Sequence, residues 1–220
     1  MKHVLLIVLL LISFYSNFAQ VNLTSGLVAY YPFTGNANDQ SGNGNNPTFN
    51  NATLTTDYYG NTNSAYSFNG TNSYILIPNS ATLNISTNKI SLCALVKPTA
   101  YYTGPCYNNA IIMKQTGDYI DGNYSLRFAD DVTGCTTPNT AKEQFYGSVG
   151  TSTGTGSVIA TVPFVQLNQW YCIIYTNDGT TGKIYVDGVL RASSAVTSSF
   201  SLTNTHDLYI GEMNNASYPY

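Results

Sequence analysis

The stretch "TNDGTTGKIYVDGVL", Thr176 to Leu190, decides the fold. It leads into two strand-like runs, "KIYV" and "VLRA", which are separated by Asp187 and Gly188. An Asp-Gly pair supplies the two positive φ angles that a two-residue type I′ turn requires. The stretch therefore predicts a β-hairpin over residues 182–192. Asp178 with Gly179 predicts a further turn just before it.

Short strand-like segments of the same kind occur on both sides of this hairpin. They are rich in β-branched and aromatic residues and are bounded by Gly, Pro or Asn, which is typical of strands. No window sustains a helical period, so we predict an all-β, antiparallel two-sheet sandwich. The other predicted strands cover residues 26–33, 65–70, 73–78, 90–98, 110–114, 124–128, 143–149, 170–176 and 207–212.

Composition and the N-terminus limit the classes of function. Only 9% of the 220 residues are charged, and the eight Lys and Arg residues are scattered through a chain of net charge −3, so no nucleic-acid partner is expected. Residues 1–20 have the polar start, apolar run and small residue of a signal peptide. We expect a secreted or cell-surface protein with one domain, residues 21–220, and no membrane span after cleavage.

Three segments resemble a known family. "GLVAYYPFTGNANDQSGNGNN" (26–46), "YSFNGTNSYILIPNS" (66–80) and the opening hairpin resemble the laminin-G-like, concanavalin A-like jelly-roll domains of secreted bacterial proteins. The resemblance covers about residues 26–213. Trp170 and Tyr171 match the family's lead-in to the hairpin, while Leu95 stands where Trp is more usual. The resemblance implies a jelly roll.

The resemblance also bears on the end of the chain. Such domains close with a Gly-Ile-Asp-Asp type of strand, which does not occur before Tyr220. We therefore expect a domain without its last strand, belonging to a longer chain with further domains. A missing strand would leave an unpaired sheet edge beside residues 26–33.

Four cysteines permit disulfides in an exported chain. Cys106 and Cys135 lie in polar, loop-like contexts and are the better candidates for a disulfide, which would close a loop of about 30 residues. Cys93 and Cys172 lie inside apolar strand-like runs, where they could pair across the core or remain buried thiols. The sequence leaves these alternatives open.

Catalysis is not expected. Glycoside hydrolysis, which jelly rolls also perform, needs two suitably spaced carboxylates. The only glutamates are Glu143 and Glu212, and neither stands in a hydrolase motif. His206 is predicted to be a surface turn residue, because one histidine cannot build a zinc site and no Ser or Cys motif accompanies it.

Sugar binding has more support, because aromatic faces stack on sugar rings and polar rims supply hydrogen bonds. The expected function is a non-catalytic module for a polysaccharide or surface glycoconjugate. The alternatives are an adhesion or matrix module that binds protein and, third, a glycoside hydrolase. Trp170 is expected in the core. The candidate ligand residues flank the predicted disulfide loop: Tyr101, Tyr102, Tyr107, Tyr119, Asp118 and Asp121.

The segment "NANDQSGNGNN" (36–46) is the candidate metal site. Asp39, Ser41 and Asn43 alternate as calcium ligands do in an EF-hand, but Asn50 occupies the place of the bidentate Glu and Asp39 is the only carboxylate, so the EF-hand interpretation fails. The family resemblance implies a looser calcium site at the rim of the sandwich. Asp39, Ser41 and Asn43 would then supply part of its shell.

Overall fold

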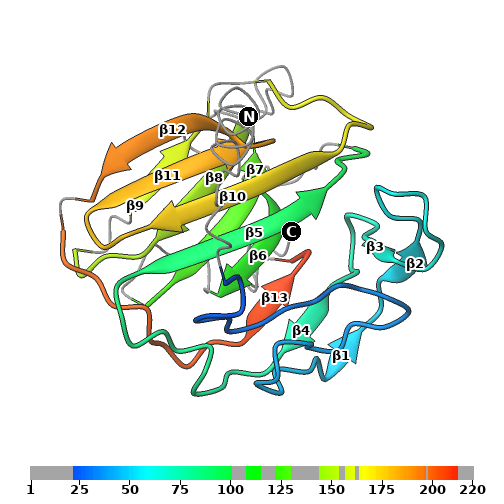
Figure 1. The fold of residues 1–220 in the computed structure, drawn as a ribbon, viewed down its shortest axis with the longest axis horizontal. Coiled ribbons are helices and arrows are strands. Elements are labelled where there is room, and N and C mark those ends of the chain that lie inside the picture. The colour runs from blue at the N-terminus through cyan, green and yellow to red at the C-terminus, as the bar shows by residue number, and fades with distance from the viewer. Residues whose placement is uncertain are drawn as a thin grey trace, which may run out of the picture.

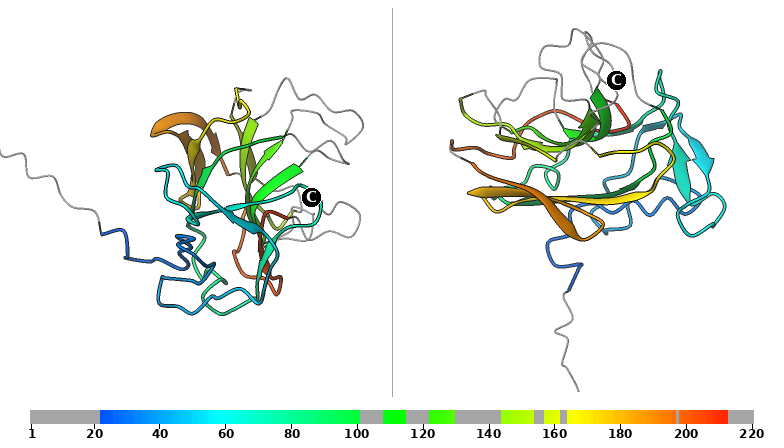
Figure 2. Two further views of the ribbon diagram at one scale, coloured as in Figure 1. Left: turned by 90° about the vertical axis from the view of Figure 1, so that its right-hand side faces the viewer. Right: turned by 90° about the horizontal axis from the view of Figure 1, so that it is seen from above.

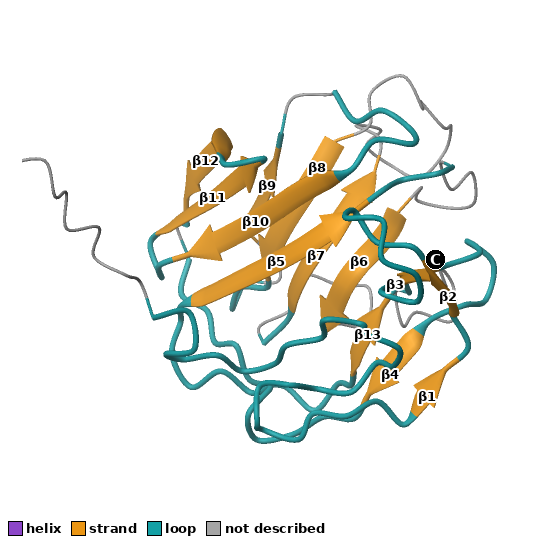
Figure 3. Ribbon diagram, turned by 45° about the vertical axis from the view of Figure 1, so that its right-hand side comes forward, coloured by secondary structure: helices purple, strands orange, loops and turns teal. Residues whose placement is uncertain are grey.

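The computed structural model describes residues 22–100, 108–114, 122–129, 144–153, 157–161, 164–196 and 198–212. These residues form strands and loops without a helix (Figure 3), so none of them belongs to a helix long and apolar enough to cross a membrane. The strands are β1 (Phe49–Asn50), β2 (Thr53–Thr55), β3 (Ala65–Ser67), β4 (Ile75–Ile77), β5 (Ile90–Val96), β6 (Asn108–Lys114), β7 (Tyr124–Ala129), β8 (Gln144–Val149), β9 (Ser157–Ala160), β10 (Tyr171–Asn177), β11 (Thr181–Val186), β12 (Val189–Ala195) and β13 (Leu208–Ile210).

Two antiparallel sheets face each other (Figures 1 and 2). The larger sheet has the order β1-β4-β13-β6-β7-β8-β9, and the smaller has the order β12-β11-β10-β5. A separate two-stranded sheet, β2-β3, lies at the right of the view in Figure 1. The predicted all-β, antiparallel two-sheet jelly roll is thus confirmed. Within the described residues β5 pairs only with β10, so it forms one edge of the smaller sheet.

The core lies between the two sheets. Along β10 the buried side chains alternate with half-buried ones, as expected of a strand with one face toward the core. Ile173 and Tyr175 of β10 are fully buried, as is Phe145 of β8. Gly147 of β8 lies directly against the Tyr175 ring, where an added Cβ would come within 2.2 Å of Cδ2. The contact brings the two sheets together at this point.

The hairpin that decided the fold forms as predicted. Asp187 and Gly188 have φ angles of 51° and 79°, and they join β11 to β12. The preceding turn also forms, because the Asp178 carboxylate accepts the N–H groups of Thr180 (2.9 Å) and Thr181 (2.8 Å). A hydrogen-bonded Asx turn of this kind is the usual role of Asp before Gly.

The strand predicted over residues 26–33 is not present. The backbone groups that would pair with a neighbouring strand bond instead with side chains of residues 39–45. The Tyr30 N–H donates to Asp39 Oδ1 (2.9 Å), and the Val28 carbonyl accepts from Ser41 Oγ (3.1 Å) and Asn43 Nδ2 (2.9 Å). The strand β9 and the short strands β1 and β2 were not predicted, because two to four residues give almost no alternating pattern.

Candidate functional site

An exposed group of aromatic side chains lies at one end of the sandwich. We define the aromatic cluster as Tyr58, Tyr59 and Trp170, with the Lys97 ammonium beside it. Tyr58 and Tyr59 are 56% and 79% exposed. The Tyr58 ring lies edge-on to Tyr59 at 5.1 Å and edge-on to Trp170 at 6.2 Å, between ring centroids. Exposed rings of this kind have apolar faces on which a sugar ring can stack, and this stacking removes apolar surface from water.

A rigid loop presents the two tyrosines. Residues 56–64 join β2 to β3, in the region at the right of Figure 1 that faces the viewer in the left panel of Figure 2. Asp57 Oδ1 accepts the N–H groups of Tyr59 (2.9 Å) and Asn61 (2.8 Å), and Asp57 Oδ2 accepts Asn61 Nδ2 (3.0 Å). Gly60, with φ of 87°, provides the left-handed residue that the tight loop needs. The side-chain hydrogen bond from Asn61 is the main cause that lowers the pKa of Asp57, so the carboxylate stays ionised and holds the loop.

The smaller sheet supplies the other half of the cluster. Val96, the last residue of β5, pairs with Tyr171, the first residue of β10, so the preceding and following residues, Trp170 and Lys97, come together just beyond this pair. The Lys97 Nζ lies 5.5 Å from the centroid of the Trp170 ring, within the range of a cation–π contact. Trp170 is half-buried and lies outside β10, so the expectation that it belongs to the core was wrong. Just before Trp170 the chain turns at Asn168, whose N–H donates to the Pro98 carbonyl (2.7 Å).

The loop of residues 36–46 brings Asp39, Ser41 and Asn43 together, as the calcium prediction requires. Their polar atoms, however, already bond with the protein. Asp39 Oδ1 accepts the N–H groups of Tyr30 and Ser41, and Oδ2 accepts Ser41 Oγ (2.8 Å) and the Asn45 N–H (2.9 Å). Burial alone would raise the pKa of Asp39, but these hydrogen bonds outweigh it and lower the pKa.

Calcium needs six to eight oxygen ligands. The side-chain amide of Asn43 donates to the carbonyl oxygens of Leu27 (2.9 Å) and Val28, so these oxygens too are engaged. No group of three or more His, Cys, Asp or Glu side chains lies together anywhere in the part of the chain that the structure describes. As they stand, the residues of this loop do not fit a calcium shell. Instead, their hydrogen bonds tie residues 27–30 to the rim, so calcium at this loop is supported by the family resemblance alone.

The remaining predicted site residues lie outside the described residues. They are the ligand candidates Tyr101, Tyr102, Tyr107, Tyr119, Asp118 and Asp121, and the disulfide candidates Cys106 and Cys135. Cys93 and Cys172 are described, both as free thiols. Neither belongs to the core, so the expectation of a core pair or of buried thiols was wrong for Cys93, which is exposed, and for Cys172, which is half-buried.

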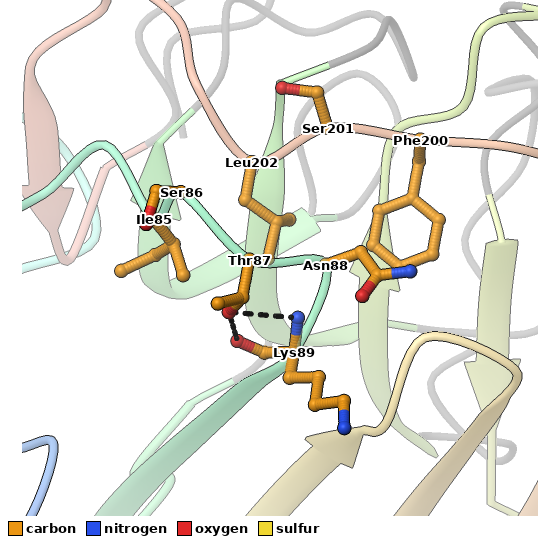
Figure 4. A pocket seen from close by; sticks show the side chains of 8 residues that line it. All are labelled: Ile85, Ser86, Thr87, Asn88, Lys89, Phe200, Ser201 and Leu202. Carbon is orange, nitrogen blue, oxygen red and sulfur yellow. Dashed lines mark hydrogen bonds between the residues drawn. The ribbon is translucent and has the colours of Figure 1, made fainter.

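A shallow pocket of about 510 Å³ lies at the other end of β5 (Figure 4). Residues 85–89 and 200–202 line it. In the view of Figure 4 the Asn88 side chain overlaps the Phe200 ring, and the Lys89 side chain extends away from both. The pocket is open to solvent. The Ile85 N–H donates to the Leu202 carbonyl (3.1 Å) and so joins the two segments that line the pocket. It is a weaker candidate than the aromatic cluster, because a single ring faces it.

The two glutamates are not among the residues of the aromatic cluster. Glu143 lies outside the described residues, and Glu212 follows β13 in the larger sheet. Burial raises the pKa of Glu212 to about 7, and its Oε2 is buried without a hydrogen-bond partner among the described residues. His206 precedes β13 and is half-buried, with its N–H donating to Asn204 Oδ1 (3.0 Å).

Two facing antiparallel sheets of this topology define a jelly-roll protein. The chain belongs to the family described as the concanavalin A-like lectin/glucanases superfamily, whose profile matches residues 69–220. The resemblance noted in the sequence is thereby confirmed. Among curated proteins, no sequence match was found.

Solved structures share the fold. The binding domain of Paraclostridial Mosquitocidal Protein 1 is 13% identical, with a TM-score of 0.59 over 90% of this chain and 47% of that chain. The Botulinum neurotoxin serotype D binding domain is 16% identical, with a TM-score of 0.54 over 79% of this chain and 40% of that one. This chain therefore spans less than half the length of either.

A third similar structure is domain 4 of AbnA, a GH43 extracellular arabinanase from Geobacillus stearothermophilus, in complex with arabinotriose. It is 19% identical, with a TM-score of 0.53 over 88% of this chain and 86% of that chain. At these identities the likeness of all three structures concerns the fold alone.

Sequence reasoning missed the aromatic cluster. Tyr58 and Tyr59 stand in "TTDYYGNTN", where Asp, Gly and Asn mark a tight loop and adjacent tyrosines have no strand partner. This is the signal that could have identified them as exposed. Their contact with Trp170 could not have been found in this way, because 111 positions (170 − 59) separate Trp170 from Tyr59.

Proposed function

We propose that this domain is a secreted, non-catalytic carbohydrate-binding module and that the aromatic cluster holds a sugar ring of a polysaccharide or surface glycoconjugate. The exposure of Tyr58 and Tyr59 on a hydrogen-bonded loop is the observation that carries the proposal. Two rigid rings lose little conformational entropy on binding, and covering them removes apolar surface from water.

The neighbouring groups fit such a ligand. Tyrosine hydroxyls and the Lys97 ammonium supply hydrogen-bond donors around the apolar faces, which is the mixture that sugar hydroxyls require. The proposal also agrees with the similarity to domain 4 of the arabinanase, which was solved with arabinotriose. Non-catalytic action is proposed because the described residues of the cluster include no carboxylate, and the adjacent Asp57 already accepts hydrogen bonds from its own loop.

The test is a glycan array on the purified domain, followed by calorimetric titration of the best polysaccharide. We expect Tyr58→Ala and Tyr59→Ala each to weaken binding by about 10-fold, the loss expected for one stacking ring. Tyr30→Ala is the matched control, because Tyr30 is 51% exposed but lies on residues 27–30, away from the cluster loop. Equal losses in all three variants, or none in the cluster variants, would refute the site.

A second candidate function is adhesion to protein, and one observation favours it. The outer face of the smaller sheet carries exposed apolar side chains, including Leu95 (45% exposed) and Leu190 (50% exposed). The register places Leu190 opposite Tyr185 and Tyr185 opposite Ile174, so an apolar row crosses the sheet. Apolar rows on a solvent face commonly mark protein contacts. Binding to purified matrix proteins that is lost in Leu190→Ser but kept in Tyr59→Ala would favour adhesion over sugar binding.

A further inference from the structure

Cys93 and Cys172 lie on the same face of two neighbouring strands. In the pairing of β5 with β10, Cys93 lies opposite Ile174 and Cys172 lies opposite Leu95, so the two cysteines are diagonal neighbours. Their sequence neighbours Leu92 and Ile173 point into the core, which places both thiols on the outer face of the smaller sheet. Cys93 is exposed there and Cys172 is half-buried.

The register places the two thiols close to each other. Diagonal residues of an antiparallel pair have Cα atoms about 7–8 Å apart, which is slightly beyond the usual range for a disulfide, so a bond between them requires the edge strand β5 to move toward β10. Burial raises the pKa of the Cys93 thiol, and the charge and hydrogen bonding of the Cys172 thiol raise it further. Both this interaction and the diagonal register are consistent with two neighbouring side chains on one face of the sheet.

The backbone around Cys172 is held in place, while that around Cys93 belongs to an edge strand. The Cys172 N–H donates to Asp187 Oδ1 (2.9 Å), and its carbonyl accepts the Asp187 N–H (2.9 Å). In the described part of the chain β5 pairs with β10 alone. A covalent bond between the two cysteines would thus fasten an edge strand to a fixed one.

We propose that Cys93 and Cys172 form a dithiol site that a low-molecular-weight disulfide, such as oxidised glutathione, oxidises to a cross-strand disulfide. The exposed Cys93 thiolate attacks the external disulfide, which forms a mixed disulfide and releases one small thiol. The Cys172 thiolate then attacks the Cys93 sulfur, which releases the second small thiol. The two protein thiols lose two protons and two electrons, and the external disulfide becomes two thiols.

The bond would stabilise the fold mainly by restricting the unfolded chain. Cys93 and Cys172 are 79 positions apart (172 − 93), so the disulfide closes a long loop. For a domain of this size, we expect oxidation to raise the melting temperature by on the order of 5–10 °C.

The test is peptide mapping by mass spectrometry on the full chain, exported and purified without reductant and alkylated before digestion. We expect a linked peptide pair that contains Cys93 and Cys172. In Cys106→Ser/Cys135→Ser, which keeps only these two thiols, oxidised glutathione should remove both free thiols and raise the melting temperature. Adding Cys93→Ser to that variant should abolish the shift.

Three outcomes would overturn the proposal. The first is full alkylation of Cys93 and Cys172 in folded protein after incubation with oxidised glutathione. The second is a mapped bond from either residue to Cys106 or Cys135. The third is a stable glutathione adduct on Cys93 that Cys172 does not displace. Mapping of the wild-type chain decides the matter even where the serine variants fail to fold.

Discussion

The contact between Gly147 and Tyr175 predicts that Gly147→Ala strongly destabilises the domain. The added Cβ would lie 2.2 Å from Cδ2 and 2.4 Å from Cγ of Tyr175, whereas ordinary van der Waals contacts begin at 3.4 Å. The Tyr175 ring or the Gly147 backbone would therefore have to move by at least 1.2 Å (3.4 − 2.2). The ring is fully buried and its hydroxyl accepts Asn177 Nδ2 (3.1 Å), so it cannot move without losing this hydrogen bond. Overpacking costs about 1–3 kcal/mol and the lost bond about 1 kcal/mol, which together give about 3 kcal/mol.

Urea unfolding followed by the fluorescence of Trp170, the single tryptophan, measures this change. For a slope of about 2–3 kcal/mol per M, the midpoint should fall by about 1–1.5 M. The double variant Gly147→Ala/Tyr175→Leu should regain part of the loss, because the smaller side chain leaves room for the new methyl group. A midpoint for Gly147→Ala that matches wild type would refute the close approach of the two sheets at this point.

Three further predictions concern polar groups. Because burial raises the pKa of Glu212 to about 7, its ionisation costs more in the folded state than in the unfolded one, and stability should fall as pH rises from about 4.5 to 7. Glu212→Gln should remove this dependence of stability on pH. If the melting temperatures of the two proteins change in parallel across this pH range, the prediction is wrong. Lys114 is fully buried and its Nζ donates to Asn84 Oδ1 (3.2 Å) and the Asn204 carbonyl (3.2 Å). Because Lys114→Met removes both of these buried hydrogen bonds, it should cost about 2–4 kcal/mol in denaturant unfolding, more than Lys183→Met on a less buried lysine. Asp39→Ala should lower stability by about 2–3 kcal/mol, and millimolar calcium should leave the wild-type melting temperature unchanged, whereas a calcium-dependent rise would restore the calcium site.

The sheets were predictable because their strands alternate and their turns carry strong local signals. The hairpin at Asp187 and Gly188 needs only two residues with positive φ, and both are specified by residue type. Residues 26–33 show the limit of this reasoning. Their composition suits a strand, but whether a partner strand or a side chain pairs with their backbone depends on contacts with residues 39–45, which a strand pattern does not encode.

The candidate site was less predictable than the fold, because it is built from three separate segments. Tyr59 and Asp57 belong to one loop, whose turn chemistry is visible in the sequence. Trp170 and Lys97 approach it only because Val96 pairs with Tyr171, and this register follows from the packing of the whole smaller sheet. The position of Cys93 on the outer face likewise depends on which face of β5 the core covers, and an apolar run such as "ISLCALV" does not show that.

The aspartates explain why we propose the aromatic rings, and not carboxylates, as the main binding groups. Each of the five aspartates in the described residues accepts a backbone N–H: Asp39 from Tyr30, Asp57 from Tyr59, Asp178 from Thr180, Asp187 from Cys172 and Asp207 from Asn79. In a chain with 9% charged residues, these carboxylates shape loops and turns, and hydrogen bonds lower the pKa of Asp178 to about 2. If these carboxylates bound a metal ion or acted as catalytic acids, they would have to give up the hydrogen bonds that hold their loops. The exposed side chains of Tyr58 and Tyr59 do not hold a loop in this way, so a ligand can cover them without disturbing the fold.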